Sequence, residues 1–318
     1  MSLAEEQVRS KPQTTWTGAL SNSALLRKVT YKHQLWLLLL PYLFGLFLLV
    51  VLPALLSIPF AFTQYNALSE PKWIGFDNFS AMFRDDLFWN GLSVSLLFIA
   101  VAVPLRVLGA VFLAFLLHKA TRANRFFRSI VYLPTIVPDV AYALLWIYIF
   151  NPLYGPLNWI LPFFGQEPHG WLLEPGPAKF AIILMMLLPI GEGFVLMLAA
   201  FHDIPNELQE SAAVDGATGR QRFTHITLPL LAPAILLLFL RDTVLSFHIT
   251  FVPALITTHA GPYNATRFLP FYIYQSASEY QQYGYAAAMT WIMYGVTAVV
   301  IALQVIVARR WRNALNAQ

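Results

Sequence analysis

The sequence contains no cysteine and few charged residues. Of its 318 residues, 11% are charged and 58% are hydrophobic, and the mean hydropathy is +0.59. A soluble domain carries about 25% charged residues, so this composition is typical of a membrane protein. The absence of cysteine excludes disulfide bonds and thiolate metal sites.

Signatures of catalysis and metal binding are also missing. The phosphate-binding pattern G-x4-G-K-[ST] does not occur, so the chain carries no ATPase motif of its own. The pattern H-E-x-x-H does not occur either, and the seven histidines are scattered along the chain. We therefore expect no metal site, no bound cofactor and no catalytic constellation, and we predict that the chain is not an enzyme.

Long apolar runs fill most of the chain and predict an all-α membrane protein with six transmembrane helices. The expected spans are residues 35–62, 91–117, 130–150, 178–201, 230–256 and 284–308. Prolines 41, 53 and 59 predict kinks in the first span. The polar lead before Leu35 is too long for a cleaved signal, so we expect an anchoring span there. The predicted organisation is a cytosolic tail (1–34), a transmembrane domain (35–308) and a second cytosolic tail (309–318).

The distribution of basic residues predicts the orientation of these spans. The two tails and the loops after the second and fourth spans hold 14 Lys and Arg residues, whereas the opposite segments hold 4. Basic residues favour the cytosolic side, so both termini and the loop 202–229 are expected in the cytosol. The sequence pI of about 9.2 has the same explanation, and we expect no nucleic-acid partner.

The loop between the fourth and fifth spans carries the most specific pattern in the chain. Residues 206–229 read NELQESAAVDGATGRQRFTHITLP, close to E-A-A-x3-G-x9-I-x-L-P. Asp203 and Pro205 suit a helix start, and Gly216 suits a left-handed helix end. Thr218 and Gln221 fit a capping box that opens a second short helix, ending near Pro229. We expect a compact helix–turn–helix on the membrane surface.

Five ionisable residues and a histidine fall inside predicted spans. They are Arg106, Asp139, Glu192, Arg241, Asp242 and His248. A charge at a helix centre costs about 2.5–3.5 kcal/mol, so these residues must face protein or a wet cavity. We infer a polar belt that links the second to the fifth span.

Two interpretations of this belt remain open. In the first, Arg106 and Arg241 form structural ion pairs, for example Arg106 with Glu192 or Asp139. In the second, some residues line the solute path, because helical spacing places carboxylates, aromatic rings and hydroxyls on shared faces. The path candidates are Asp139, Tyr142, Trp146, Glu192, Asp242, Ser246 and His248, with Thr250 on the same face as Ser246. Gly191 and Gly193, after Pro189, indicate an unwound or closely packed stretch.

The chain resembles the inner-membrane permease subunits of carbohydrate ABC importers, of the maltose/glycerol-phosphate type. The resemblance covers nearly everything after residue 35, including FRSIVYLPTIVP, LYGPLNWIL, IPNELQESAAVDGA and ITTHAGPYNAT. The LYGPLN and THAGPYNAT blocks resemble the first of the two paired permeases. The resemblance implies the type I importer permease fold and a multi-pass protein of the prokaryotic plasma membrane. The implied partners are a second permease subunit, two ATP-binding subunits that hold ATP and Mg, and an extracytoplasmic solute-binding protein.

The resemblance also assigns roles to the loop pattern. The residues that match the ATPase-docking loop are Glu207, Glu210, Ser211, Ala212, Asp215 and Gly216. Ser211 replaces the second alanine of the pattern, a small-for-small change. Arg106 and the Arg241–Asp242 pair are unusual at their positions, so import of glycerol phosphate or another anionic solute is the alternative to sugar import. A proton-coupled secondary transporter that uses Asp139, Glu192 and Asp242 is an alternative of another class.

Overall fold

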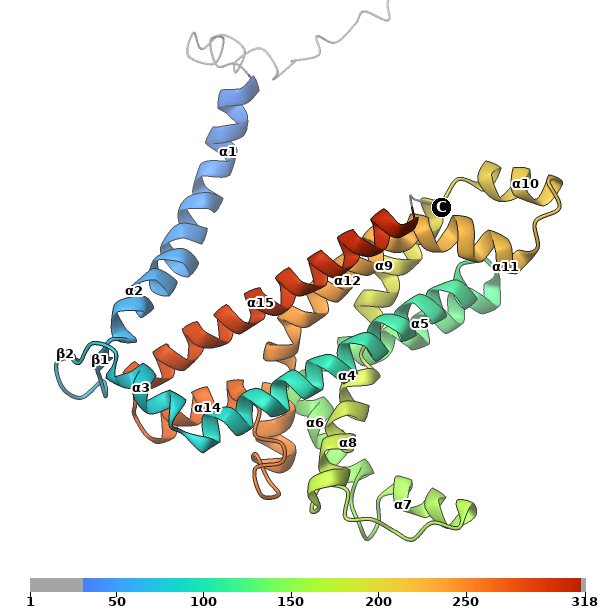
Figure 1. Cartoon of the computed structure of the whole chain (residues 1–318). Coiled ribbons are helices and arrows are strands. Elements are labelled where there is room, and N and C mark those ends of the chain that lie inside the picture. Colours follow the sequence, from blue (N-terminus) through green and yellow to red (C-terminus); the bar gives the residue numbers. More distant parts are fainter. Residues whose placement is uncertain (1–30, 316–318) are drawn as a thin grey trace, which may run out of the picture. The chain divides into compact units, whose positions relative to one another are not determined.

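The computed structural model describes residues 31–315, most of which are helical (Figure 1). Of the predicted tails, residues 1–30 and 316–318 lie outside the described part of the chain. The chain forms two compact units that divide after Ser57.

The first unit is an apolar helix. It contains α1 (Tyr31–Leu46), a π-helical segment (Phe47–Val51) and the start of α2 (Leu52–Phe60), which runs into the second unit. Pro53 lacks the N–H that would bond to the carbonyl of Leu49, so the wider π-helical turn stands where a regular helix would be interrupted. Large apolar side chains are exposed from Leu35 to Leu56, so this helix offers its surface to lipid or to another protein.

The second unit is built around one long helix. It opens with an antiparallel pair of two-residue strands, β1 (Thr63–Gln64) and β2 (Lys72–Trp73), and a short helix, α3 (Asp77–Phe83). The long helix α4 (Asp86–Leu117) follows, with Asp85 as its N-cap. Buried residues of α4 recur from Phe88 to Ala114, so its whole length belongs to the core.

The remaining helices surround α4 or connect its neighbours. In chain order they are α5 (Arg122–Ile136), α6 (Asp139–Ile149), α7 (Pro156–Ile160), α8 (Pro175–Leu187), α9 (Gly191–His202), α10 (Asn206–Val214), α11 (Gly219–Arg222), α12 (Leu228–Ile249), α13 (Phe251–Pro253), α14 (Leu269–Tyr274) and α15 (Tyr283–Leu315). One apolar cluster joins α4 to α9, α12, α14 and α15. A second cluster joins α4 to α6 and α8.

Two pairs of helices replace two predicted spans. The span expected over 130–150 is formed by two helices, α5 and α6, which meet at an angle of 100°. Pro138 holds the preceding residue, Val137, in an extended conformation (φ −70°, ψ 128°), which ends α5. The span expected over 178–201 likewise consists of two helices, α8 and α9, which meet at 45° around Pro189, where the glycine pattern indicated an unwound or closely packed stretch.

The described residues contain enough apolar helix for a multi-pass membrane protein. Four helices are long and apolar enough to cross a membrane, and the number rises to six if each bent pair counts as one span. The predicted six spans correspond to this higher number. The strand pair at residues 63–73 was not predicted, since two residues per strand leave no alternating pattern to read.

Candidate functional site

Arg106 lies at the centre of a buried ionic network between helices. Its Nε atom is 3.1 Å from Oδ2 of Asp242 on α12, and its side chain is 9% exposed. Its two Nη atoms donate to the backbone carbonyls of Met186 (3.1 Å), in the last turn of α8, and Pro189 (3.4 Å), in the α8–α9 break. Helix ends leave carbonyls without intrahelical donors, and here Arg106 supplies the donors.

Arg241 extends the network toward solvent. Its Nη1 atom donates to Oδ1 of Asp242 at 3.2 Å, and its Nη2 atom pairs with Glu192 on α9. Asp242 is 4% exposed and lies between the two guanidinium groups, whereas Glu192 is 56% exposed. A carboxylate buried this deeply requires such pairing, since an isolated buried charge is costly.

The ion pairs that were expected are present, but the partners differ. Arg106 was predicted to pair with Glu192 or Asp139, and it pairs with Asp242 instead. Both α9 and α12 pack against α4, but it is Asp242 on α12 that meets Arg106, whereas Glu192 at the start of α9 meets Arg241. Asp139 begins α6 at the α5–α6 break, is exposed, and has no ion pair within residues 31–315.

A small cavity adjoins this network at both helix breaks. Its volume is about 160 Å³, and Asp139, Tyr142, Glu192 and Arg241 contribute to its lining, with apolar residues from α5, α8 and α12. Ligand pockets usually enclose about 300–1,000 Å³. The cavity is therefore smaller than a typical ligand pocket.

The other predicted path residues divide by position. Tyr142 is buried and donates to the carbonyl of Met185 at 2.7 Å. Trp146 is also buried but stacks on Phe150, with ring centroids 4.9 Å apart, and it does not line the cavity. The structure thus places Trp146 in the core and leaves Tyr142 at the cavity.

The polar face predicted on α12 is packed inside the protein. The Ser246 hydroxyl donates to the carbonyl of Asp242 (2.6 Å), and the Thr250 hydroxyl donates to that of Ser246 (2.9 Å). Both hydroxyls satisfy their donors within their own helix, as is common for Ser and Thr in apolar helices. His248 is exposed and lies outside the cavity lining.

The loop over 202–229 forms a surface helix followed by a helical entry into α12. Gly216 has φ +81° and ends α10 in the left-handed conformation, as predicted. The predicted capping box is also present, with reciprocal hydrogen bonds between Thr218 and Gln221. Two expectations were wrong. Asp203 ends α9 and does not cap α10, whose N-cap is Pro205. The second helix is not short, because α11 continues through a π-helical segment into α12.

Helix α10 projects from the rest of the second unit (Figure 1). Its attachment consists of a hydrogen bond from Gln209 to the Thr227 hydroxyl (3.0 Å) and one from Arg222 to the Gln209 carbonyl (3.4 Å). The side chains on its outer surface are acidic, small or aliphatic, and Val214 is 88% exposed. The exposed residues include Glu207, Glu210, Ser211, Asp215 and Gly216, while Ala212 is half-buried. The helix is thus held in place and presents an exposed surface.

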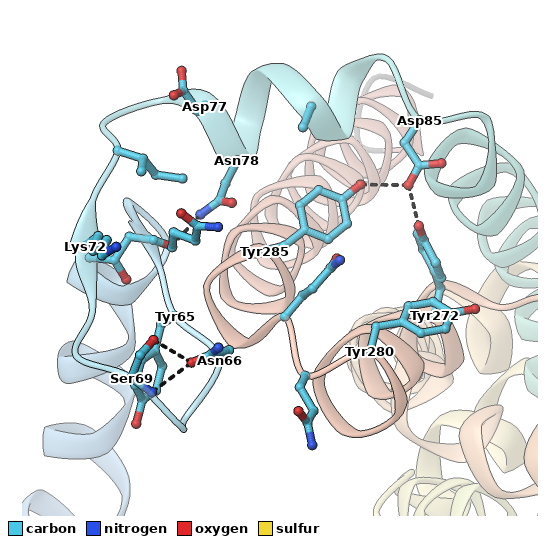
Figure 2. A pocket seen from close by; sticks show the side chains of 16 residues that line it. Tyr65, Asn66, Ser69, Lys72, Asp77, Asn78, Asp85, Tyr272, Tyr280 and Tyr285 are labelled. Carbon is cyan, nitrogen blue, oxygen red and sulfur yellow. Dashed lines mark hydrogen bonds between the residues drawn. The ribbon is translucent and has the colours of Figure 1, made fainter.

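Sequence reasoning missed two features. One is the pair of backbone carbonyls that Arg106 holds, which carry no side-chain signal. The other is a cavity of about 660 Å³ near β1, β2 and the start of α15, lined largely by tyrosines and carboxamides (Figure 2). Its residues come from segments far apart in the chain, so no local pattern reveals it.

Comparison with protein families matches residues 106–313 to the binding-protein-dependent transport system inner membrane component family. The chain belongs to this family. The matched region of the permease contains the ionic network, the bent helix pairs and α10. The permease is an inner-membrane protein, as predicted.

Two curated relatives and one solved structure illustrate the similarity. The probable ABC transporter permease protein YesP of Bacillus subtilis is 36% identical over 265 residues, covering 82% of this chain and 85% of the relative. The galactooligosaccharides transport system permease protein GanP of the same species is 33% identical over 284 residues, covering 83% and 67%. A bacterial ABC transporter involved in import of the acidic polysaccharide alginate matches with a TM-score of 0.74 and 24% identity, covering 91% and 99%.

These matches confirm the predicted family and fold class of the permease. The relatives are permease subunits of ABC transporters, so the alternative of a proton-coupled secondary transporter is set aside. The permease is therefore a subunit of an ABC transporter.

Proposed function

We propose that this permease forms half of the translocation path of an ATP-driven importer of sugars or oligosaccharides. Its partners in this proposal are a second permease subunit, two ATP-binding subunits and an extracytoplasmic solute-binding protein. The naming of the family and the named substrate of the relative GanP support this assignment. The basic residues near the chain ends and in the loops support a cytosolic position for both termini and for α10.

The exposed helix α10 is the observation that carries the proposal. An isolated surface helix of nine residues is marginal in water, yet α10 is held by a proline N-cap, a glycine end and bonds to the entry of α12. Its exposed carboxylates and Val214 form a surface suited to docking in a groove of another protein. In our proposal that groove lies on the ATP-binding subunit, which holds ATP and Mg, and Glu207, Glu210, Ser211, Ala212, Asp215 and Gly216 make the contact.

The solute path is proposed to run past the small cavity at the helix breaks. Asp139, Tyr142 and Glu192 line this cavity, so they are the path candidates that the geometry favours. Trp146, Ser246 and His248 lie in the core or outside the cavity, and the geometry gives them no place on the path. Because the cavity is small, we propose that the second permease subunit completes the path.

The charge balance favours neutral solutes over anions. Arg106 and Arg241 are both paired with carboxylates, and Asp139 adds a negative charge without a basic partner within residues 31–315. The local formal charge is therefore negative, which disfavours a phosphate or another anion. We propose neutral sugars as the solute class and expect uptake of maltotriose or galactotriose by the assembled transporter in proteoliposomes to exceed uptake of glycerol 3-phosphate.

Charge reversal at Glu210 tests the coupling role of α10. The change Glu210→Lys should abolish solute uptake by proteoliposomes that contain the four transporter subunits and the binding protein. The physical reason is loss of an exposed carboxylate at the docking surface and its replacement by a like-sized cation. We would measure uptake, ATP hydrolysis and co-purification of the ATP-binding subunits.

Glu167→Lys is the matched control, since Glu167 is an exposed carboxylate in the segment between α7 and α8. This control should keep uptake near the wild-type level. Normal uptake in Glu210→Lys, with the ATP-binding subunits still bound, would remove the docking role from α10.

A further inference from the structure

A cavity near the β1–β2 hairpin lies away from both the ionic network and α10. It has a volume of about 660 Å³ and shares no lining residue with the cavity at the helix breaks. Its walls come from the β1–β2 hairpin, from α3 with Asp85, and from the α14–α15 region (Figure 2). The start of α15 contributes to it, whereas α10 lies near the opposite end of α15 (Figure 1).

The floor of the cavity is a preorganised hydrogen-bonded cluster. One oxygen of Asp85 accepts from the hydroxyls of Tyr272 and Tyr285, and the other accepts from the backbone N–H of Leu87 at 2.9 Å. Figure 2 shows both tyrosine hydroxyls directed at this carboxylate. Burial alone would raise the pKa of the Asp85 carboxyl, but these hydrogen bonds outweigh it and lower the pKa below its usual value. The Asp85 carboxylate therefore makes the floor anionic, and its hydrogen bonds hold the Tyr272 and Tyr285 hydroxyls in place.

The hairpin wall is held just as firmly. The Asn78 amide donates to the carbonyls of Ala61 and Thr63, at 2.9 Å each, and so fixes the strand to α3. The Asn66 side chain accepts from Ser69, through its backbone N–H (3.0 Å) and its hydroxyl (2.8 Å), which closes the hairpin turn. The Tyr65 ring stacks on Phe60, with centroids 5.0 Å apart. These contacts fix the hairpin wall of the cavity.

The rim of the cavity carries polar groups with free hydrogen-bonding capacity. Among residues 35–310, whose side chains the structure describes, those of Gln64, Tyr280 and Gln282 have no hydrogen-bond partner, and all three are exposed. Lys72 and Asp77 also line the cavity and form no ion pair within the same residues. Carboxamides and a phenol both donate and accept, so the rim can match groups that do the same.

This lining selects the chemical class of the ligand. Sugar hydroxyls donate and accept hydrogen bonds, and the apolar face of a pyranose packs on an aromatic ring. Two carboxylates against one ammonium group disfavour phosphate or sulfonate. No group of acidic and histidine residues suited to a metal ion occurs among the described residues. The volume falls within the range of about 300–1,000 Å³ typical of ligand pockets.

We propose that this cavity is a second saccharide-binding site, which takes a neutral di- or trisaccharide on the face of the permease opposite α10. Tyr280 and Gln64 contact the sugar, and the Asp85–Tyr272–Tyr285 cluster orients the cavity floor. The inference rests on the proposed function, because it assigns the site to the solute class that the transporter imports. A site here retains solute at the entrance, before it reaches the path at the helix breaks.

Saturation-transfer NMR on the complete transporter in nanodiscs, without binding protein, tests this site. The probes are maltotriose and galactotriose. We expect saturation transfer to at least one probe in the wild type, and about tenfold weaker binding in the double variant Tyr280→Ala with Gln64→Ala, since one ring contact and one hydrogen-bonding amide are lost. The matched control is Tyr154→Ala with Gln166→Ala, which alters an exposed tyrosine and glutamine outside the cavity and should bind like the wild type.

Three results would overturn the proposal. The first is the absence of saturation transfer to both probes in a wild-type complex that hydrolyses ATP. The second is unchanged probe binding in the cavity variant. The third concerns ATP hydrolysis by the cavity variant. If this variant binds the probes like the wild type but needs more binding protein for half-maximal ATP hydrolysis, the cavity is a protein-docking surface instead. A complex that binds the probes but imports no sugar would instead contradict the proposed function and leave the cavity assignment standing.

Discussion

Two aspartates near the helix breaks show how one residue type serves different purposes. Asp242 is 4% exposed and holds Arg106 and Arg241 together, whereas Asp139 is exposed and has no ion pair within residues 31–315. Removal of the Asp242 carboxylate should therefore lower the free energy of unfolding more than removal of the Asp139 carboxylate. Removal of one partner from a buried ion pair typically costs about 3–5 kcal/mol.

We expect Asp242→Ala to reduce the yield of monodisperse protein sharply, because it leaves the buried Arg106 guanidinium without a carboxylate partner, whereas Arg241 still pairs with Glu192. Asp139→Ala should leave the yield and the thermal midpoint nearly unchanged but lower solute uptake, since Asp139 lines the cavity on the proposed path. Size-exclusion profiles and uptake in proteoliposomes measure both effects. Equal loss of folded protein in the two variants would assign Asp139 a structural role instead.

The Asp85 cluster gives a pH dependence with a definite sign. The folded-state pKa of Asp85 lies below its unfolded value of about 3.9, so its contribution to stability is complete at neutral pH. That contribution disappears as the pH falls through the folded-state pKa. The raised pKa of Tyr272, caused by burial and by Asp85, keeps its hydroxyl protonated throughout this range.

We expect Asp85→Asn to lower the thermal midpoint at neutral pH by about 2–4 °C, which corresponds to ~1 kcal/mol for a lost charge-assisted hydrogen bond. Asparagine still caps α4, so the helix start is kept. The difference in midpoint between wild type and variant should shrink below about pH 4. A difference that stays constant down to that pH would show that the carboxylate charge contributes nothing.

At the scale of elements, the breaks in two helix pairs depend on close backbone approach. Gly191 begins α9, and a Cβ atom built there would lie 2.4 Å from Oγ1 of Thr135 and 2.9 Å from Cα of Tyr132. Its backbone N–H donates to the same Oγ1 atom at 3.1 Å. The start of α9 is thus fixed to α5 by a contact that admits only glycine.

Gly191→Ala should destabilise the permease by about 1–3 kcal/mol, as expected when a well-packed site receives an extra methyl group. Gly176→Ala in α8 is the matched control, because nothing lies within 4 Å of a Cβ atom at that position. Thermal unfolding of both purified variants, followed by loss of monodisperse protein, measures the effect. Equal midpoints for the two variants would contradict the packing argument.

Features that depend on neighbouring residues in the chain were predicted well. Features that depend on contacts between distant residues were not. The left-handed Gly216 and the Thr218–Gln221 capping box depend on neighbouring residues only, so the sequence was sufficient. The 100° bend before Asp139 was missed, because Pro138 inside an apolar run is equally compatible with a kinked continuous helix. Asp203 was misassigned because α9 extends to it and uses it as a C-cap.

At the scale of the whole molecule, the composition predicted a membrane protein and the pattern over 206–229 predicted its family. Neither predicted which residues meet in the ionic network or in the tyrosine-lined cavity. The choice of Asp242 as partner of Arg106 depends on which helices pack side by side, over a separation of 136 residues in the chain. The tyrosine-lined cavity likewise joins residues from the first third and the last sixth of the chain. A single sequence holds no signal for such pairs.

The continuity of α11 with α12 has a mechanical consequence. Residues 219–258 form one helical stretch of 40 residues, long enough to reach about 60 Å. A tilt imposed at its surface end travels along a stiff shaft to Asp242, where the two guanidinium groups are anchored to the bent helices. In our proposal, this helix carries a push on α10 to the break between α8 and α9. Between its surface end and Asp242, the helix contains the π-helical segment Phe223–Thr227 and Pro233.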